Sequence, residues 1–246
     1  MLAGSPCTVA LAREPAPAAN APELTAAQIL RRADAVRFPQ QGFEVNVDIQ
    51  TTADGRMEDE HRYKVLSKGN ENALVLTVAP AAERGQILLM KGSNLWVFLP
   101  RVSQPVRLSL AQRLVGQVAN GDIARANFSG DYTPKVLGTE RIGNDALYVL
   151  DLTAVKRTVT YQHVRYWVEQ RNFRPYKADF YALSGRLLKT CRYEDFKPLG
   201  GKIRPTKLVM TDALNRGERS TMRYSDMKLR AIPDRVFSKD YLKRLE

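Results

Sequence analysis

Alternating hydrophobic and polar residues run through most of the chain. Residues 43–50 read FEVNVDIQ, in which apolar and polar positions alternate without a break, a pattern typical of a strand with one buried and one wet face. The Asp54-Gly55 pair that follows is a strong hairpin signal. Further strands are predicted near residues 57–67, 72–79, 85–91, 94–99, 134–141, 146–155, 162–170, 176–183, 186–196, 203–213 and 217–229. Strands at hairpin spacing predict one continuous antiparallel meander.

Three segments depart from this pattern. Residues 25–38 have helical spacing of apolar residues, a start signal at Thr25 and a stop at Pro39. Residues 109–122, SLAQRLVGQVANGD, repeat apolar residues at helical spacing and also predict a helix. A short closing helix is expected over 238–245. Because a sheet of so many strands must curl or close, we expect the first two helices to pack into its hollow.

The most apolar segment, residues 85–100, reads GQILLMKGSNLWVFLP. Its two apolar runs are separated by a turn at residues 91–94. We interpret Leu88, Met90, Trp96 and Phe98 as one face of a hairpin that lines the hollow. The alternative is that these side chains simply fill the core.

Charge is distributed unevenly along the 246 residues. Lys and Arg number 38 against 26 Asp and Glu. Residues 1–100 hold 10 basic and 11 acidic residues, whereas residues 101–246 hold 28 and 15. This asymmetry favours an anionic partner of the later half, such as a membrane surface, nucleic acid or an acidic protein. The alternative is a basic surface without a dedicated partner.

Residues suited to catalysis are scarce. The two histidines, His61 and His163, both fall inside predicted strands, and no nucleotide-binding, nucleophile-elbow or zinc-protease motif occurs. The acidic residues before His61 point to alternating faces of their strand, which argues against a metal site there. Cys7 and Cys191 are too far from other ligands to suggest a metal. We therefore expect no enzyme activity, no metal and no cofactor.

Nucleic acid binding is a competing hypothesis. Aromatic and basic side chains mix over residues 161–177, as they do in proteins that bind single strands. The same segment alternates like any half-buried strand, and it carries no RNA-binding or zinc-finger signature. We therefore expect no nucleic acid partner.

The N-terminal 23 residues differ from the rest. They are rich in Ala and Pro, lack periodicity, and contain Ala19-Asn20-Ala21, which is similar to a signal-peptidase site. No basic residue precedes their apolar part. We expect residues 1–23 to be a leader or a disordered tail, with any signal peptide incomplete or mis-started, and residues 24–246 to form a single domain. No stretch has the roughly 20 apolar residues of a membrane-spanning helix.

The order of features over about residues 25–246 resembles the LolA/LolB superfamily, and most closely its periplasmic outer-membrane lipoprotein-sorting proteins. The segments that carry the resemblance are the helix at 29–36 before strand 43–50, the hairpin 85–100, Gly116 with Asn120-Gly121-Asp122, Tyr132, 167–169 with 175–177, 185–189, Pro205, Met210, and 232–234 with 237–242.

The resemblance implies a mainly β fold: one strongly curved antiparallel sheet, an incomplete β-barrel, with helices covering an apolar cavity on its concave face. It also implies a periplasmic carrier of lipoprotein or lipid acyl chains, exported to a Gram-negative periplasm and partnered with an RND-type exporter of the inner membrane. The basic excess of the later half gives an anionic membrane surface as another expected partner. A docking or sensor module for a membrane protein is the alternative. The residues that we expect to contact acyl chains are Phe43, Val45, Val47, Ile49, Leu88, Met90, Trp96, Phe98, Leu110, Leu114 and Val118.

Overall fold

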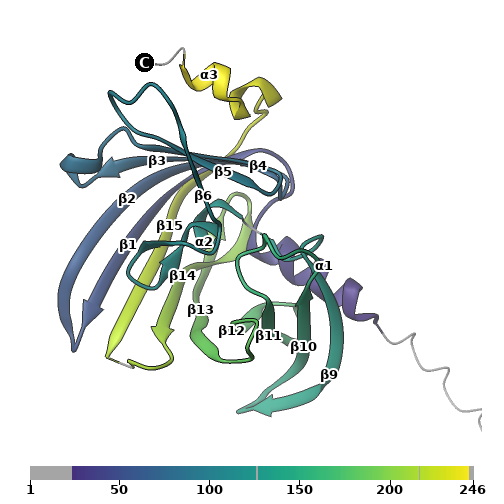
Figure 1. The fold of residues 1–246 in the computed structure, drawn as a ribbon. Helices are drawn as coiled ribbons and strands as arrows, with labels where there is room; N and C mark the ends of the chain where they lie inside the picture. The colour runs from purple at the N-terminus through teal and green to yellow at the C-terminus, as the bar shows by residue number, and fades with distance from the viewer. Residues whose placement is uncertain (1–23, 126, 216, 244–246) are drawn as a thin grey trace, which may run out of the picture.

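The computed structural model describes residues 24–125, 127–215 and 217–243. Its main element is a sheet of thirteen antiparallel strands in the order β6-β5-β4-β3-β2-β1-β15-β14-β13-β12-β11-β10-β9. The first and last strands of the chain pair in the middle of this sheet, so the edges are β6 and β9. The sheet bends around a hollow without closing (Figure 1), which confirms the predicted fold class.

The strands of this sheet match the predicted meander closely. They are β1 (Phe43–Ala53), β2 (Arg56–Lys68), β3 (Asn72–Ala79), β4 (Ile87–Lys91), β5 (Asn94–Phe98), β6 (Val106–Leu108), β9 (Tyr132–Ile142), β10 (Asp145–Ala154), β11 (His163–Glu169), β12 (Pro175–Tyr181), β13 (Leu187–Leu199), β14 (Lys202–Asp212) and β15 (Glu218–Leu229). The short edge strand β6 was not predicted. Residues 1–23, with the predicted leader or tail, lie outside the described residues.

Helix α1 (Ala26–Arg37) begins where the sequence predicts it. The Thr25 side chain accepts a hydrogen bond from the Gln28 amide, and the Gln28 side chain accepts one from the Thr25 amide, which satisfies two donors at the helix start. Its apolar face, with Ile29 and Leu30, is buried against the sheet. At the other end, Arg204 Nη1 donates to the carbonyls of Ala35 and Val36.

The predicted helix over 109–122 is wrong. Most of this segment is extended and forms a small hairpin of β7 (Arg113–Val115) and β8 (Val118–Ala119), followed by the one-turn helix α2 (Asn120–Ala124). Gly116 turns the hairpin with a φ of 50°, and a side chain there would collide with Thr51 and Ser220 of the sheet. A continuous helix cannot supply this backbone conformation.

Residues 109–125 and 127–131, here called the strap, connect edge strand β6 to edge strand β9. The strap crosses the concave face, and α2 lies in the hollow between the two ends of the sheet (Figure 1). Leu110 and Val118 of the strap are buried, whereas Leu114 is half-buried. The hollow is therefore covered by α1 and by a largely extended strap rather than by two long helices.

The predicted common face of the 85–100 hairpin is also wrong. In the observed register Leu88 lies opposite Val97, and Leu89 lies opposite Trp96. Residues directly opposite each other share a face, so Leu88 and Met90 point into the hollow while Trp96 and Phe98 point away from it. When two residues form the loop of a hairpin, each even-numbered residue of one strand lies opposite an odd-numbered residue of the other. The prediction instead placed even-numbered residues of both strands on one face.

Trp96 and Phe98 belong to a second apolar cluster on the convex face. The C-terminal elements η2 (Asp234–Phe237) and α3 (Lys239–Lys243) cover it, and Lys239 Nζ lies 4.1 Å from the centre of the Trp96 ring. Its buried members are Leu74, Leu89, Phe98, Ile232, Phe237 and Leu242. The predicted closing helix is found at 239–243, and residues 244–246 lie outside the described part of the chain.

We expect Phe237→Ala to lower the free energy of unfolding by about 3–5 kcal/mol, because it removes a fully buried ring and leaves a cavity. Leu214→Ala is the control, since Leu214 is 77% exposed and surface substitutions change stability by about 0.5 kcal/mol or less. Urea titration followed by circular dichroism measures both. Equal effects of the two substitutions would show that the C-terminal cover contributes nothing.

Candidate functional site

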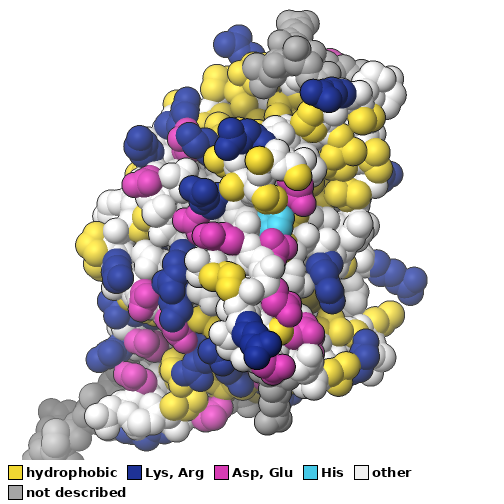
Figure 2. Space-filling view, turned by 90° about the vertical axis from the view of Figure 1, so that its left-hand side faces the viewer, with side chains coloured by type: hydrophobic (Ala, Val, Ile, Leu, Met, Phe, Trp, Pro, Cys, Tyr) yellow, Lys and Arg dark blue, Asp and Glu magenta, His cyan; other side chains and the backbone are white. Residues whose placement is uncertain are grey.

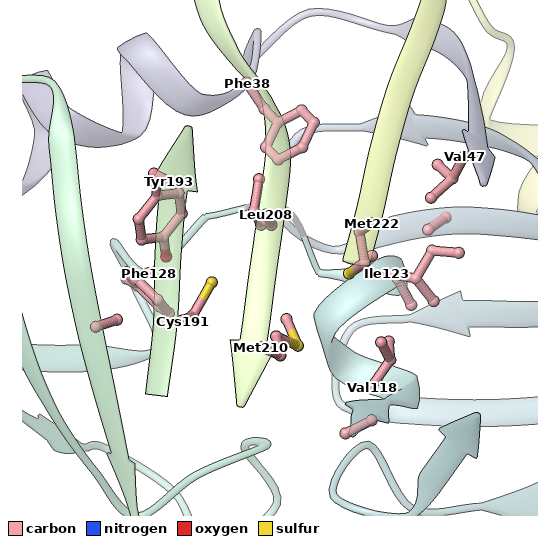
Figure 3. Close-up of a cluster of buried hydrophobic side chains, with 14 of the residues drawn as sticks. Phe38, Val47, Val118, Ile123, Phe128, Cys191, Tyr193, Leu208, Met210 and Met222 are labelled. Carbon is pink, nitrogen blue, oxygen red and sulfur yellow. The ribbon is translucent and has the colours of Figure 1, made fainter. Parts of the chain in front are cut away.

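The concave face of the sheet is the candidate binding surface. Phe43, Val45, Val47 and Ile49 alternate with polar residues along β1, and all four side chains are buried in the main core. Leu88, Met90, Leu110 and Val118 belong to the same core, and Leu114 packs against it. Figure 3 shows Val47, Val118, Ile123 and Met222 close together where α2 meets the sheet. Of the eleven predicted contact residues, Trp96 and Phe98 fall outside this surface.

The hollow is filled by the protein's own side chains in this structure. Two small pockets lie deep between the strap and the sheet, with volumes of about 30 and 10 Å³. A more open recess of about 220 Å³ lies where residues 111–119 of the strap meet the ends of β13 and β14. A single water requires about 10–15 Å³ on this measure, whereas pockets for drug-sized ligands have volumes of about 300–1,000 Å³. In the described part of the chain the deep hollow therefore has no space for an acyl chain, which could enter it only if the strap moved.

The strap is attached to α1 through one buried carboxylate. Asp34 accepts hydrogen bonds from the backbone amides of Phe128 (3.1 Å) and Ser129 (2.7 Å). Burial raises the pKa of Asp34, while the nearby Arg37 charge and the bonds to Ser129 and Phe128 oppose the rise. The carboxylate thus holds backbone groups of the strap that would otherwise lack a partner.

Two hairpin turns at the rim hold the same end of the strap. Asn70, in the β2–β3 turn, accepts from the Asn127 amide at 2.9 Å and donates to Asp131 at 3.4 Å. Arg125 pairs with Asp131 at 2.6 Å and donates to the Gly92 carbonyl of the β4–β5 turn. These contacts are polar and lie at the margin of the hollow.

A buried ion pair holds the middle of the strap to β13. Lys189 Nζ lies 2.7 Å from Asp122 Oδ2 and also donates to the Gln117 carbonyl. The Tyr161 hydroxyl donates to Asp122 at 2.8 Å. Removing one partner of such a pair costs about 3–5 kcal/mol, because a buried charge is left uncompensated. Asp122 and Lys189 therefore set the position of α2 in the hollow.

Sequence reasoning missed these charged residues inside the hollow. The helical period could have placed two of them: Asp34 and Arg37 follow Leu30 at spacings of four and seven, which puts them on its face of α1. Both are buried, with 1% and 7% of their surface exposed. No local signal marked Asp122 and Lys189 as partners, since 67 residues separate them.

Cys191 lies on β13 and lines the deep pocket of about 30 Å³. Its side chain is fully buried, and burial raises the pKa of the thiol to about 12. A thiol in this state reacts slowly, because the thiolate is the reactive form. Cys7, the other cysteine, is outside the described residues.

Other chemistry on the described part of the chain is limited. His61 is buried, with Nδ1 3.3 Å from Asp59 and Nε2 3.3 Å from Glu83. No cluster of three or more His, Cys, Asp or Glu among the described residues could hold a metal ion. Within the same residues, no helix is long and apolar enough to cross a membrane.

The convex face is strongly charged, with both signs interspersed. Asp48 lies across from Arg62 on one side and from Arg223 on the other, and Asp151 lies across from Lys135 and Arg165. Figure 2 shows the same mixture of basic and acidic side chains on the side of the molecule that lies at the left in Figure 1. Opposite charges across strands are mutually stabilising.

The aromatic and basic residues of the 161–177 segment do not form one surface. Tyr166 is fully buried in the hollow, whereas its neighbour Arg165 is exposed on the convex side. The Trp167 indole donates to Glu140 at 2.6 Å, and Lys177 Nζ lies 3.9 Å from the centre of its ring. These side chains serve the fold on two opposite faces, which argues against the nucleic acid hypothesis.

Comparison with known proteins gives clear relatives. A crystal structure of a LolA superfamily protein from Nitrosomonas europaea is 61% identical, covers 89% of this chain and 100% of its own, and has a TM-score of 0.85. A crystal structure from Vibrio parahaemolyticus is described as a putative outer membrane lipoprotein-sorting protein domain. It is 19% identical, has a TM-score of 0.74, and covers 89% of this chain and 98% of its own. A DUF1329 family protein from Desulfovibrio piger is 21% identical with a TM-score of 0.73, over 88% and 97%. These last two share the fold.

A family model described as an uncharacterized protein matches residues 69–244. No match is found among curated proteins.

Opening of the strap can be measured through Cys191. In a Cys7→Ser background, we expect Asn70→Ala to raise the rate at which a thiol reagent labels Cys191 by on the order of tenfold. The substitution removes three tethers, the bonds of Asn70 to Asn127, Ser129 and Asp131, each worth about 0.5–1.5 kcal/mol, and leaves the sheet intact. Asn46→Ala is the matched control, because Asn46 bonds Asp226 on the convex face. An unchanged rate for Asn70→Ala would mean that Asn70 does not hold the strap closed.

Proposed function

Because the chain belongs to the LolA superfamily, we propose that it is a non-enzymatic periplasmic carrier that binds acyl chains of a lipoprotein or lipid in the hollow of its sheet. The observation that carries the proposal is the covered concave face. Its apolar wall is closed by a strap that is largely extended and attached at several points by polar contacts. Displacing the strap would exchange its apolar side chains for those of a guest.

The energetics favour such an exchange. Burying an acyl chain yields about 0.8 kcal/mol for each methylene, so ten methylenes would supply about 8 kcal/mol. The tethers made by Asn70, Arg125 and Asp131 lie near the rim, so water can replace them when the strap leaves. Asp34 and the Asp122–Lys189 pair are buried and oppose its opening. The apolar side chains of the strap lose their cover in that exchange, and this loss sets the affinity for the guest.

The route of the cargo is less constrained. The relative from Vibrio parahaemolyticus bears a lipoprotein-sorting description, which favours transfer toward the outer membrane. The basic excess of residues 101–246 favours contact with an anionic membrane surface. Partnership with an RND-type exporter rests on the sequence resemblance alone.

Carriage is tested by mass spectrometry of the intact protein purified from a periplasmic extract, and by transfer of a pyrene-labelled phospholipid between phosphatidylcholine vesicles. We expect co-purified lipid and accelerated transfer. Lipid-free protein that neither accelerates transfer nor binds the label would contradict the proposal and favour the docking alternative.

Two substitutions on one strand make the test specific to the concave face. We expect Val47→Phe to reduce phospholipid transfer several-fold, because the larger ring occupies space in the hollow; its cost to folding is about 1–3 kcal/mol. Asn46→Phe adds the same ring on the convex side of β1 and should leave transfer unchanged. Circular dichroism confirms the folded fraction of each. Equal transfer by both variants would exclude the concave face as the binding surface.

A further inference from the structure

Arg37 is an unusual occupant of an apolar hollow. Its guanidinium carbon lies 4.3 Å from the centre of the Phe128 ring and 5.6 Å from that of Tyr193, and the side chain lines the deep pocket of about 30 Å³. Nη1 is 3.7 Å from Asp34, which is too long for a hydrogen bond. Among the described residues, Nε and Nη1 are buried without a hydrogen-bond partner.

A second donor in the same cluster also lacks a partner. The Tyr166 hydroxyl is buried with no hydrogen bond among the described residues. Its ring meets Phe128 edge-on at 5.2 Å and Tyr193 at 6.1 Å, so it shares both aromatic neighbours with Arg37. Figure 3 shows Phe128 and Tyr193 beside each other at this end of the hollow. Buried donors are nearly always satisfied, so these two groups indicate an acceptor that the folded chain does not provide.

The charges inside the hollow restrict what this acceptor can be. Arg37 is balanced by Asp34, Lys189 by Asp122, and Arg125 by Asp131. An anionic group bound at Arg37 would therefore add a negative charge that none of these three paired cations is free to offset, at a high desolvation cost. A neutral oxygen with two lone pairs accepts the free hydrogens without that cost.

We infer that Arg37 and Tyr166 form a carbonyl-recognition site that holds the ester or amide carbonyl of a bound acyl chain. The inference rests on the proposed function and deepens it: the carrier would select acylated molecules over plain hydrocarbons and over free fatty acids. Phe128 belongs to the strap and covers both donors when the hollow is closed. Moving the strap exposes the donors at the same time as the apolar wall.

The test compares three guests with the same chain: methyl laurate, which has a neutral carbonyl; laurate, which has a charged head; and dodecane, which has no acceptor. Each displaces the fluorophore N-phenyl-1-naphthylamine from the protein. For Tyr166→Phe we expect methyl laurate to bind about three- to tenfold more weakly, with dodecane unchanged. Tyr241→Phe, in the cluster on the convex face that the C-terminal elements cover, should change neither affinity.

Arg37→Met should weaken methyl laurate further, but it leaves Asp34 without its cation and can impair folding. Tyr166→Phe removes a hydroxyl that has no partner, so it should fold normally and carries the test. If Tyr166→Phe leaves the ratio of methyl laurate to dodecane affinity unchanged, the pocket holds water only and the inference fails. Preference of the wild-type protein for laurate would also overturn it. If the fluorophore and every guest fail to bind, the carrier proposal itself fails.

A diacyl phospholipid and a synthetic diacylated cysteine peptide distinguish the two sources of the carbonyl in the same assay. We expect Tyr166→Phe to weaken whichever of them binds the wild-type protein more tightly. No effect on that molecule would contradict a carbonyl contact.

Discussion

A curled sheet of thirteen strands that does not close leaves an apolar concave face with no partner sheet, and the rest of this molecule depends on that constraint. The two edge strands, β6 and β9, are consecutive strands of the sheet along the chain. The segment between them must therefore pass from one edge to the other, and the hollow lies on its way. The strap and α1 bury the face that the sheet cannot bury by itself. The convex face is rich in charged residues, and near β4 and β5 the C-terminal elements cover a smaller apolar cluster.

The strap combines an apolar underside with polar attachments. Val118, Ile123 and Phe128 fill the hollow, while Asp34, Asn70 and Lys189 bind its backbone or side chains. Such an arrangement defines one closed position sharply, since hydrogen bonds and ion pairs depend strongly on geometry. It also leaves the sheet independent of the strap, because the ladder hydrogen bonds between strands do not involve it. A cover of this kind suits a hollow that has to be emptied and filled.

Sequence patterns predicted an element correctly where its conformation depends on interactions between residues close together in the chain. The strand β1 follows from unbroken alternation, and α1 follows from Thr25, Gln28 and Pro39. The prediction failed over 109–122, where apolar residues at spacings of four matched a helix. There the contact of Gly116 with Thr51 and Ser220 required a turn, and both partners are distant in the sequence. The hairpin at 85–100 was placed correctly, but its faces depended on the register across a two-residue turn.

By itself the sequence determined a mainly β meander, its turns, the first helix and the resemblance to a family of half-barrels, because alternation, capping and turn chemistry act over a few residues. Only the tertiary structure decided that the hollow is closed, and that Asp122 and Lys189 meet inside it. It also decided that the C-terminal elements cover the convex cluster that contains Phe98. These features depend on contacts between residues tens to more than a hundred positions apart, which the curvature of the sheet brings together and no local pattern encodes.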